Sequence, residues 1–93
     1  MTTRYERIGT TLRTVFAPAQ LEITDESTKH ARHAGRNGIS GGETHYRVTM
    51  VAESLAGRSR VERSRAVHEA LDAEFKTGLH ALSLTLRTPE EAA

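Results

Sequence analysis

Histidine is the residue type in this chain that could do chemistry. Five histidines and no cysteine occur among the 93 residues. Imidazole is a common metal ligand and the side chain that titrates near neutral pH, whereas a chain without cysteine has neither a thiolate nucleophile nor a Cys-based metal site. The chemistry that the sequence favours is therefore metal ligation by imidazole. The candidates are His30, His33, His45, His68 and His80.

His80 is the most informative of the five. It stands two residues after Gly78, where a stretch begins in which leucines at every second position alternate with small or polar residues. This period of two predicts a half-buried strand. A histidine at the end of a strand can reach an open rim, where a metal uses one ring nitrogen and a neighbouring acceptor can bind the other. A buried His80 would instead need partners for both ring nitrogens or lose about 1 to 3 kcal/mol.

The other four histidines have weaker signals. His30 and His33 lie three residues apart in the glycine-rich segment 27–42, which has no apolar periodicity and is predicted to be a long loop. Such a pair is either a metal-binding pair or two solvated side chains, and the spacing does not decide. His45 lies on the polar face of a predicted strand and is expected to be solvated or locally hydrogen-bonded. His68 lies near the apolar stripe of a predicted helix and is expected at the edge of the core.

Arginines cluster at the start of that helix. Arg58, Arg60, Arg63 and Arg65 form a basic stripe that either contacts phosphates or is a solvated face interleaved with Glu62. The net charge is only +1, from 13 basic against 12 acidic side chains, so phosphate binding would depend on this local cluster. The two Tyr and two Phe mostly belong to apolar stripes, and few aromatic rings are left for base stacking.

An independent catalytic activity is not expected. Ser27, Asp25 and His30 are close in sequence, but a predicted mobile loop supplies no rigid nucleophile, aligned base or oxyanion hole. The glycines of the same segment do not form a phosphate-binding loop, because no Lys-Ser/Thr pair follows and the segment leads into a strand. The chain is therefore predicted not to be an enzyme.

Capping boxes and chain breakers define the elements that must position these residues. Thr3 with Glu6 and Ser59 with Glu62 have the Ser/Thr-x-x-Glu form that begins a helix, and Pro18 and Gly78 end the two predicted helices. Their apolar stripes are predicted to comprise Tyr5, Ile8, Leu12, Val15 and Phe16 in the first helix, and Val61, Val67, Leu71 and Phe75 in the second. Strands are predicted at 19–24, 44–51 and 81–86, and 88–93 is expected to be a flexible tail.

Strand parity predicts how these elements pack. Tyr46, Val48 and Met50 share one face of the second strand, and Leu82, Leu84 and Leu86 share one face of the third, so both sets should face the helices. The first two strands should pair antiparallel, and the long helix should cross over to a parallel third strand. The fold class is α+β, one domain over 1–93. No apolar run suits a membrane span or signal peptide, so a cytoplasmic protein is expected.

Motifs along nearly the whole chain, from about Arg4 to Pro89, resemble the BolA family. They are Asp25-Glu-Ser27 with His30 and His33-Ala-Gly35, Gly42-Glu-Thr-His45-Tyr-Arg-Val48, Gly57 with Val61-Glu-Arg63 and Arg65, and Gly78-Leu-His-Ala-Leu-Ser-Leu84 with Thr88-Pro89. The resemblance implies a KH-like domain of order α-β-β-α-α-β, with a three-stranded mixed sheet and helices on one face. This order agrees with the one predicted from capping boxes and periodicity, in which 52–57 is a short helix or turn between the second strand and the long helix.

The resemblance also implies a partner and a cofactor. BolA-like proteins pair with monothiol glutaredoxins and share a [2Fe-2S] cluster, in iron-sulfur trafficking or regulation of iron homeostasis. His80 matches the family's C-terminal histidine, and His30 matches its loop ligand, with His33 as the alternative. Glutaredoxin and glutathione would supply thiolates to one iron and two imidazoles would bind the other. The isolated chain is expected to hold no cluster, since it lacks cysteine.

The resemblance leaves a second function open. BolA-like proteins are also described as DNA-binding transcriptional regulators, and the KH-like surface here would contact duplex DNA through Arg58, Arg60, Arg63 and Arg65. This sequence departs from the family's Arg-His-Arg at Arg63-Ser64-Arg65, which removes a histidine from the helix. The chain alone is expected to be a monomer or a weak homodimer without a membrane partner.

Overall fold

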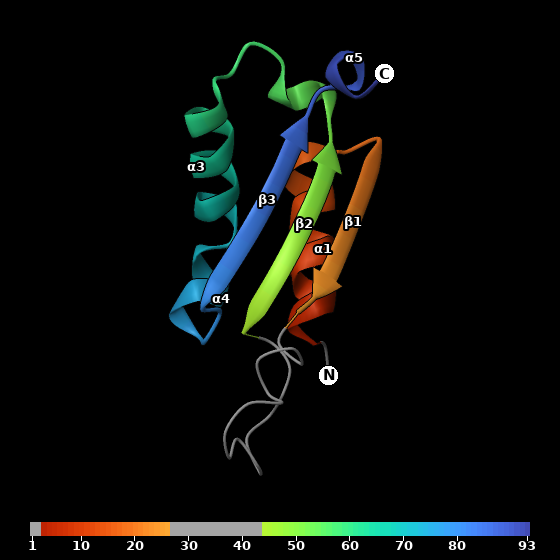
Figure 1. Ribbon diagram of the computed structural model, residues 1–93. Helices are drawn as coiled ribbons and strands as arrows, with labels where there is room; N and C mark the ends of the chain where they lie inside the picture. Colours follow the sequence, from red (N-terminus) through yellow and green to blue (C-terminus); the bar gives the residue numbers. More distant parts are fainter. Residues whose placement is uncertain (1–2, 27–43) are drawn as a thin grey trace.

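The computed structural model describes residues 3–26 and 44–93 (Figure 1), and His30 and His33 lie outside them. The elements, in chain order, are α1 (Arg4–Phe16), β1 (Gln20–Asp25), β2 (His45–Val51), the 3₁₀ helix η1 (Glu53–Leu55), α3 (Arg60–Ala70), α4 (Asp72–Lys76), β3 (Ala81–Arg87) and α5 (Pro89–Ala92). None of the helices in the described residues is long and apolar enough to cross a membrane.

The three strands form one mixed sheet in the order β1-β2-β3. β1 pairs antiparallel with β2, and β2 pairs parallel with β3, as predicted. The chain between the two parallel strands runs through α3 and α4, which lie beside β3, while α1 lies behind the sheet in the view of Figure 1. The predicted crossover is confirmed, and it brings the starts of β2 and β3 to the same end of the molecule.

Both predicted capping boxes are present. The Glu6 amide donates to the Thr3 hydroxyl at 3.1 Å, and the Glu62 amide donates to the Ser59 hydroxyl at 3.1 Å. The return bonds, from the Thr3 and Ser59 amides to the two carboxylates, hold the pKa of Glu6 and of Glu62 below the ordinary value. These four bonds use amides that have no partner inside the helix, so they fix where α1 and α3 begin.

The core lies between the helices and one face of the sheet. The buried apolar residues include Ile8, Leu12 and Phe16 of α1, Tyr46, Val48 and Met50 of β2, and Val67 and Leu71 of the crossover. In β3, Leu84 is half-buried against this core while Ser83 is exposed. The predicted parity of both strands is therefore confirmed.

Three members of the predicted helix stripes are not in the core. Tyr5, Val15 and Val61 are 48%, 55% and 58% exposed. Each lies in the first or last turn of its helix. Helical periodicity gives the angular position of a side chain but not how far along the axis the covering elements extend. The prediction was wrong at these helix ends for that reason.

The C-terminal third also differs from the sequence-based expectation. The predicted long helix is interrupted at Leu71, whose backbone leaves the helical region at φ −101° and ψ 15° and separates α3 from α4. Instead of a flexible tail, residues Pro89–Ala92 form α5, which begins with a capping box between Thr88 and Glu91. Both features matter for the surfaces described below, because Glu74 lies in α4 and Glu91 lies in α5.

Candidate metal centre

His80 is exposed at the start of β3, as expected for a strand-end ligand. Its backbone N–H donates to the Thr44 carbonyl at 2.8 Å, and the N–H of Ala81 donates to the same oxygen at 3.0 Å. Thr44 directly precedes β2. One carbonyl therefore ties the first residues of both parallel strands together.

His45 lies beside His80. The parallel register pairs His45 with Ala81, and the two imidazole ring centroids are 5.4 Å apart with planes tilted by 53°. The ring is oriented by Thr44, whose hydroxyl oxygen lies 2.9 Å from Nδ1 of His45. The expected local hydrogen bond is confirmed, but sequence reasoning missed the neighbouring imidazole. The available signal was a histidine at or directly before the start of each of two parallel strands, since β2 begins at His45 and His80 precedes β3.

The separation of the two rings is that of an ordinary ring contact, and it is also compatible with both imidazoles binding one metal. A metal–nitrogen bond is about 2 Å long, so two imidazoles on one tetrahedral metal have ring centroids about 5 Å apart. The observed 5.4 Å matches this value. Within 3–26 and 44–93, no three His, Cys, Asp or Glu side chains gather to hold a metal ion. A metal bound by His45 and His80 thus needs further ligands from outside the described residues, for example from a partner protein.

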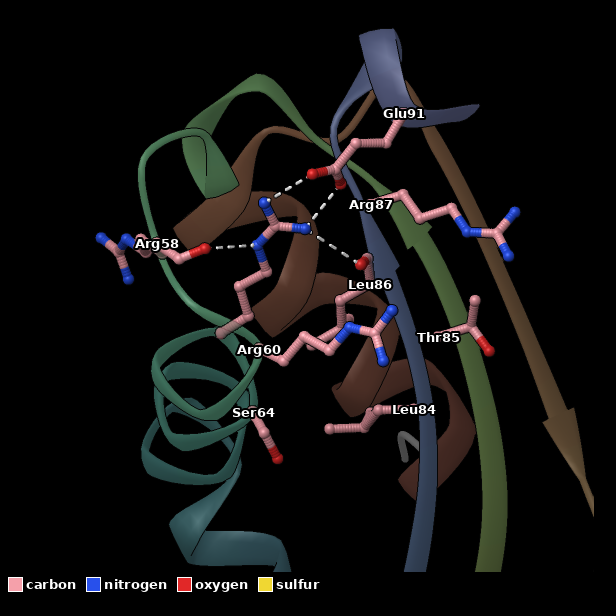
Figure 2. A pocket seen from close by; sticks show the side chains of 9 residues that line it. Arg58, Arg60, Ser64, Leu84, Thr85, Leu86, Arg87 and Glu91 are labelled. Carbon is pink, nitrogen blue, oxygen red and sulfur yellow. Dashed lines mark hydrogen bonds and ion pairs between the residues drawn. The ribbon is translucent and has the colours of Figure 1, made fainter. Parts of the chain in front are cut away.

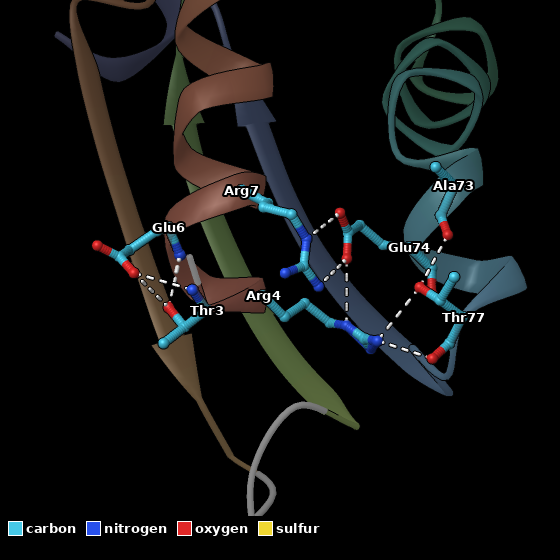
Figure 3. A network of polar contacts seen from close by, with 7 residues as sticks. All are labelled: Thr3, Arg4, Glu6, Arg7, Ala73, Glu74 and Thr77. Carbon is cyan, nitrogen blue, oxygen red and sulfur yellow. Dashed lines mark hydrogen bonds and ion pairs between the residues drawn. The ribbon is translucent and has the colours of Figure 1, made fainter. Parts of the chain in front are cut away.

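A buried ion-pair cluster precedes His80 in the chain (Figure 3). Arg4 of α1 and Glu74 of α4 have side chains only 7% and 10% exposed, and Nε of Arg4 donates to Glu74 at 3.2 Å. Arg7 donates two further hydrogen bonds to the same carboxylate, each at 3.0 Å. Arg4 also donates to the Thr77 carbonyl at 2.8 Å. The cluster therefore joins the start of α1 to the turn that leads into His80.

Gly78 completes that turn with a backbone that favours glycine. Its φ of +128° is one that L side chains rarely adopt, and an added Cβ would meet the Arg4 guanidinium at 3.4 Å. The next residue, Leu79, is buried, and its N–H donates to the Glu74 carbonyl at 2.8 Å. The chain between α4 and His80 is thus fixed on both sides of the glycine.

His68 belongs to the junction of α3 and α4. Its Nδ1 lies 2.8 Å from the Ser64 carbonyl, and its ring stacks on the half-buried Phe75 with centroids 5.2 Å apart. The side chain is exposed, so the expected edge-of-core position is correct only in its contact with Phe75. This contact makes His68 a suitable control for the histidines at the strand ends.

Arg63 is the one member of the predicted basic stripe that is buried. It makes two hydrogen bonds to the Glu91 carboxylate, at 2.6 and 3.0 Å, and it also donates to the carbonyls of Arg58 and Leu86 (Figure 2). The Arg63 hydrogen bonds, followed by that from the Thr88 amide, lower the pKa of Glu91 to about 2. Arg63 is therefore occupied by contacts within the domain.

Exposed arginines surround this pair. Arg58, Arg60 and Arg87 line a cleft of about 630 Å³ between the start of α3 and the end of β3, and Arg65 lies outside the lining. No hydrogen bond or ion pair joins the guanidinium groups of Arg58, Arg60 or Arg87 to another of the described residues. The structure thus divides the predicted stripe into a buried arginine and exposed ones, and it adds Arg87.

Comparison with known proteins identifies the family. The family model for "BolA-like protein" matches residues 12–91. The chain belongs to the BolA family. The solved structure of BolA1 from Arabidopsis thaliana covers 100% of this chain with a TM-score of 0.89 and 39% sequence identity, and 99% of that structure is covered in turn. The predicted α-β-β-α-α-β fold is confirmed.

Two curated relatives support the assignment. The chain is 40% identical over 89 residues to Protein BOLA1, chloroplastic, of Arabidopsis thaliana, an alignment that covers 96% of this chain and 56% of that protein. It is 36% identical over 86 residues to the DNA-binding transcriptional regulator BolA of Escherichia coli, covering 92% of this chain and 76% of the regulator. The chain thus spans little more than half of the Arabidopsis relative. BolA family proteins are not enzymes, which agrees with the prediction from sequence.

Proposed function

We propose that this BolA-family chain is the partner of a monothiol glutaredoxin, with which it shares a [2Fe-2S] cluster in iron-sulfur trafficking or in the regulation of iron homeostasis. The observation that carries the proposal is the exposed His80 beside His45 at one end of the sheet, in a chain without cysteine. Imidazole donors suit iron, and a chain without thiolates needs a partner to complete such a cluster. A cytoplasmic location stays a prediction.

His80 would supply one imidazole, and three residues compete to supply the second. His30, or His33 in its place, is the choice that the family resemblance implies, and the ring separation makes His45 a third candidate. Histidine ligation of one iron gives such a cluster a higher reduction potential than all-cysteine ligation. The chain's own contribution is to orient its ligands, because Thr44 holds both the start of β3 and the ring of His45.

Anaerobic reconstitution with a monothiol glutaredoxin, glutathione, iron and sulfide tests the proposal. We expect His80→Ala to abolish the histidine-ligated cluster, seen as loss of its visible absorption and EPR signal. Single alanine variants of His30, His33 and His45 identify the second ligand as the one whose loss shifts the EPR g-values. His68→Ala is the matched control, because its ring stacks on Phe75 at the α3–α4 junction.

The result that contradicts cluster ligation is equally specific. If His80→Ala reconstitutes with an unchanged visible spectrum and unchanged g-values, this chain does not ligate the cluster through His80. A complex that still forms would then show that the domain docks on glutaredoxin without touching the cluster. Pull-down of apo-glutaredoxin separates that outcome from loss of the partner.

DNA binding is the second candidate function. It is favoured by the name of the Escherichia coli relative and by the exposure of Arg58, Arg60 and Arg65 along the start of α3. Arg63 is left out, because Glu91 occupies it. If the three exposed arginines contact phosphates, their replacement by alanine should flatten the salt dependence of duplex binding by about 2 to 3 in the logarithmic slope. An unchanged slope would leave them as a solvated helix face.

A further inference from the structure

The lining of the arginine cleft carries a net positive charge. It contains four arginines and one glutamate, Glu91, which is ion-paired with Arg63 and also accepts from the Thr88 amide. Figure 2 shows Arg60 and Leu86 close to Glu91, with Arg58 and Arg87 extending to opposite sides of the cleft. The neighbouring Glu62 lies outside the lining; it caps the Ser59 amide and also interacts electrostatically with Arg58. The lining itself therefore has more guanidinium groups than carboxylates, next to half-buried leucines.

The backbone edge of β3 also faces this cleft. β3 is the last strand in the sheet order, so no further strand pairs with its outer side. Arg63 donates to the Leu86 carbonyl at 3.3 Å, so this backbone oxygen points away from β2 and already has a partner within the domain. An extended peptide can pair with such an edge through main-chain hydrogen bonds.

The cleft already binds one carboxylate. Glu91 enters from α5 and accepts two parallel hydrogen bonds from the Arg63 guanidinium. This bidentate geometry is the strong form of arginine–carboxylate recognition. Aromatic rings, on which nucleic-acid bases stack, are absent from the lining, which consists of Arg, Ser, Leu, Thr and Glu. Carboxylates suit this surface better than unpaired bases.

We propose that the cleft between α3 and β3 binds an extended acidic segment of a partner protein. Its carboxylates would pair with Arg58, Arg60 and Arg87, its backbone would add to the edge of β3, and its apolar side chains would lie on Leu84 and Leu86. The cleft lining in β3 begins at Leu84 and ends at Arg87, which lie about 13 and 23 Å from His80 at the rise of a strand. The segment can thus bind while the histidine end is occupied, so this proposal stands independently of the cluster.

Fluorescence anisotropy with the full chain tests the proposal. The probe is a short fluorescein-labelled peptide of alternating glutamate and valine, and the same peptide with glutamine in place of glutamate is its control. We compare Arg58→Ala/Arg60→Ala/Arg87→Ala with a charge-matched triple variant outside the lining, Arg13→Ala/Arg65→Ala/Lys76→Ala. Circular dichroism checks that both variants fold.

Three exposed ion pairs lost together predict a Kd raised by about 10- to 100-fold in the cleft variant, against less than about 2-fold in the matched variant. Amide chemical shifts of Leu84, Thr85 and Leu86 should move with the acidic peptide only. Failure of the peptide to bind, or an equal loss in both variants, overturns the proposal. The proposal would also be overturned if a short DNA duplex bound more tightly than the peptide and both triple variants weakened that DNA binding equally. This result would favour a nucleic-acid surface that includes Arg65.

Discussion

Glu74 is the carboxylate that pairs with Arg4 and Arg7 of α1 close to the turn before His80, and its removal is the most informative test of how the domain positions that histidine. Arg4 is nearly buried, with a side chain 7% exposed, whereas Arg7 is 38% exposed. The three side chains form one cluster but differ in what each leaves behind when it is deleted.

The expected costs follow from that difference. Glu74→Ala removes the carboxylate that accepts from the buried Arg4 guanidinium, and breaking a buried pair in this way costs about 3 to 5 kcal/mol of unfolding free energy. Arg4→Ala leaves Glu74 with two hydrogen bonds from Arg7 but removes the donor to the Thr77 carbonyl, so we expect about 2 kcal/mol. Arg7→Ala removes an ion pair whose arginine side chain is 38% exposed and should cost below about 1 kcal/mol.

Urea denaturation followed by far-UV circular dichroism measures these costs, and native-state hydrogen exchange locates them. In Arg4→Ala, protection should fall at the amides of Leu79 and His80, because the turn loses its bond to α1, while Arg7→Ala should leave both protected. Equal costs for Arg4→Ala and Arg7→Ala, or a Glu74→Ala cost below about 1 kcal/mol, would refute this account of the cluster.

Two further predictions concern the opposite end of the domain and the core. The pKa of Glu91 is lowered from 4.5 to about 2, so its contribution to stability is fully present above pH 4.5 and is lost as the pH falls towards 2. Acid titration should therefore show a stability difference between wild type and Glu91→Gln that disappears over this range. A constant difference would contradict the ion pair as its source. Leu12→Ala should cost about 3 to 5 kcal/mol because Leu12 is fully buried, while Val15→Ala, at 55% exposure, should cost less than about 0.5 kcal/mol by the same denaturation assay.

Local sequence determined where the helices begin and which faces of the strands are buried. The capping boxes at Thr3 and Ser59 act over three residues, and the alternation in 44–51 and 81–86 acts over two, so both are visible without knowledge of the fold. The position of His80 at a strand end was predictable from the same local pattern, but its exposure was not, because parity with Leu82, Leu84 and Leu86 points it towards the helix-covered face. Even the parallel crossover follows from the order of the elements.

Tertiary structure alone decided which distant side chains meet. His45 and His80 become neighbours only because β2 and β3 pair in the register that sets His45 beside Ala81. Arg63, predicted to belong to an exposed basic stripe, is buried and pairs with Glu91 of α5. The exposed arginines Arg58, Arg60 and Arg87 line the cleft beside this pair. Periodicity predicts which face of a single helix or strand is buried, whereas contacts between residues far apart in sequence depend on the relative positions of whole elements. Those positions are set by packing of the complete core.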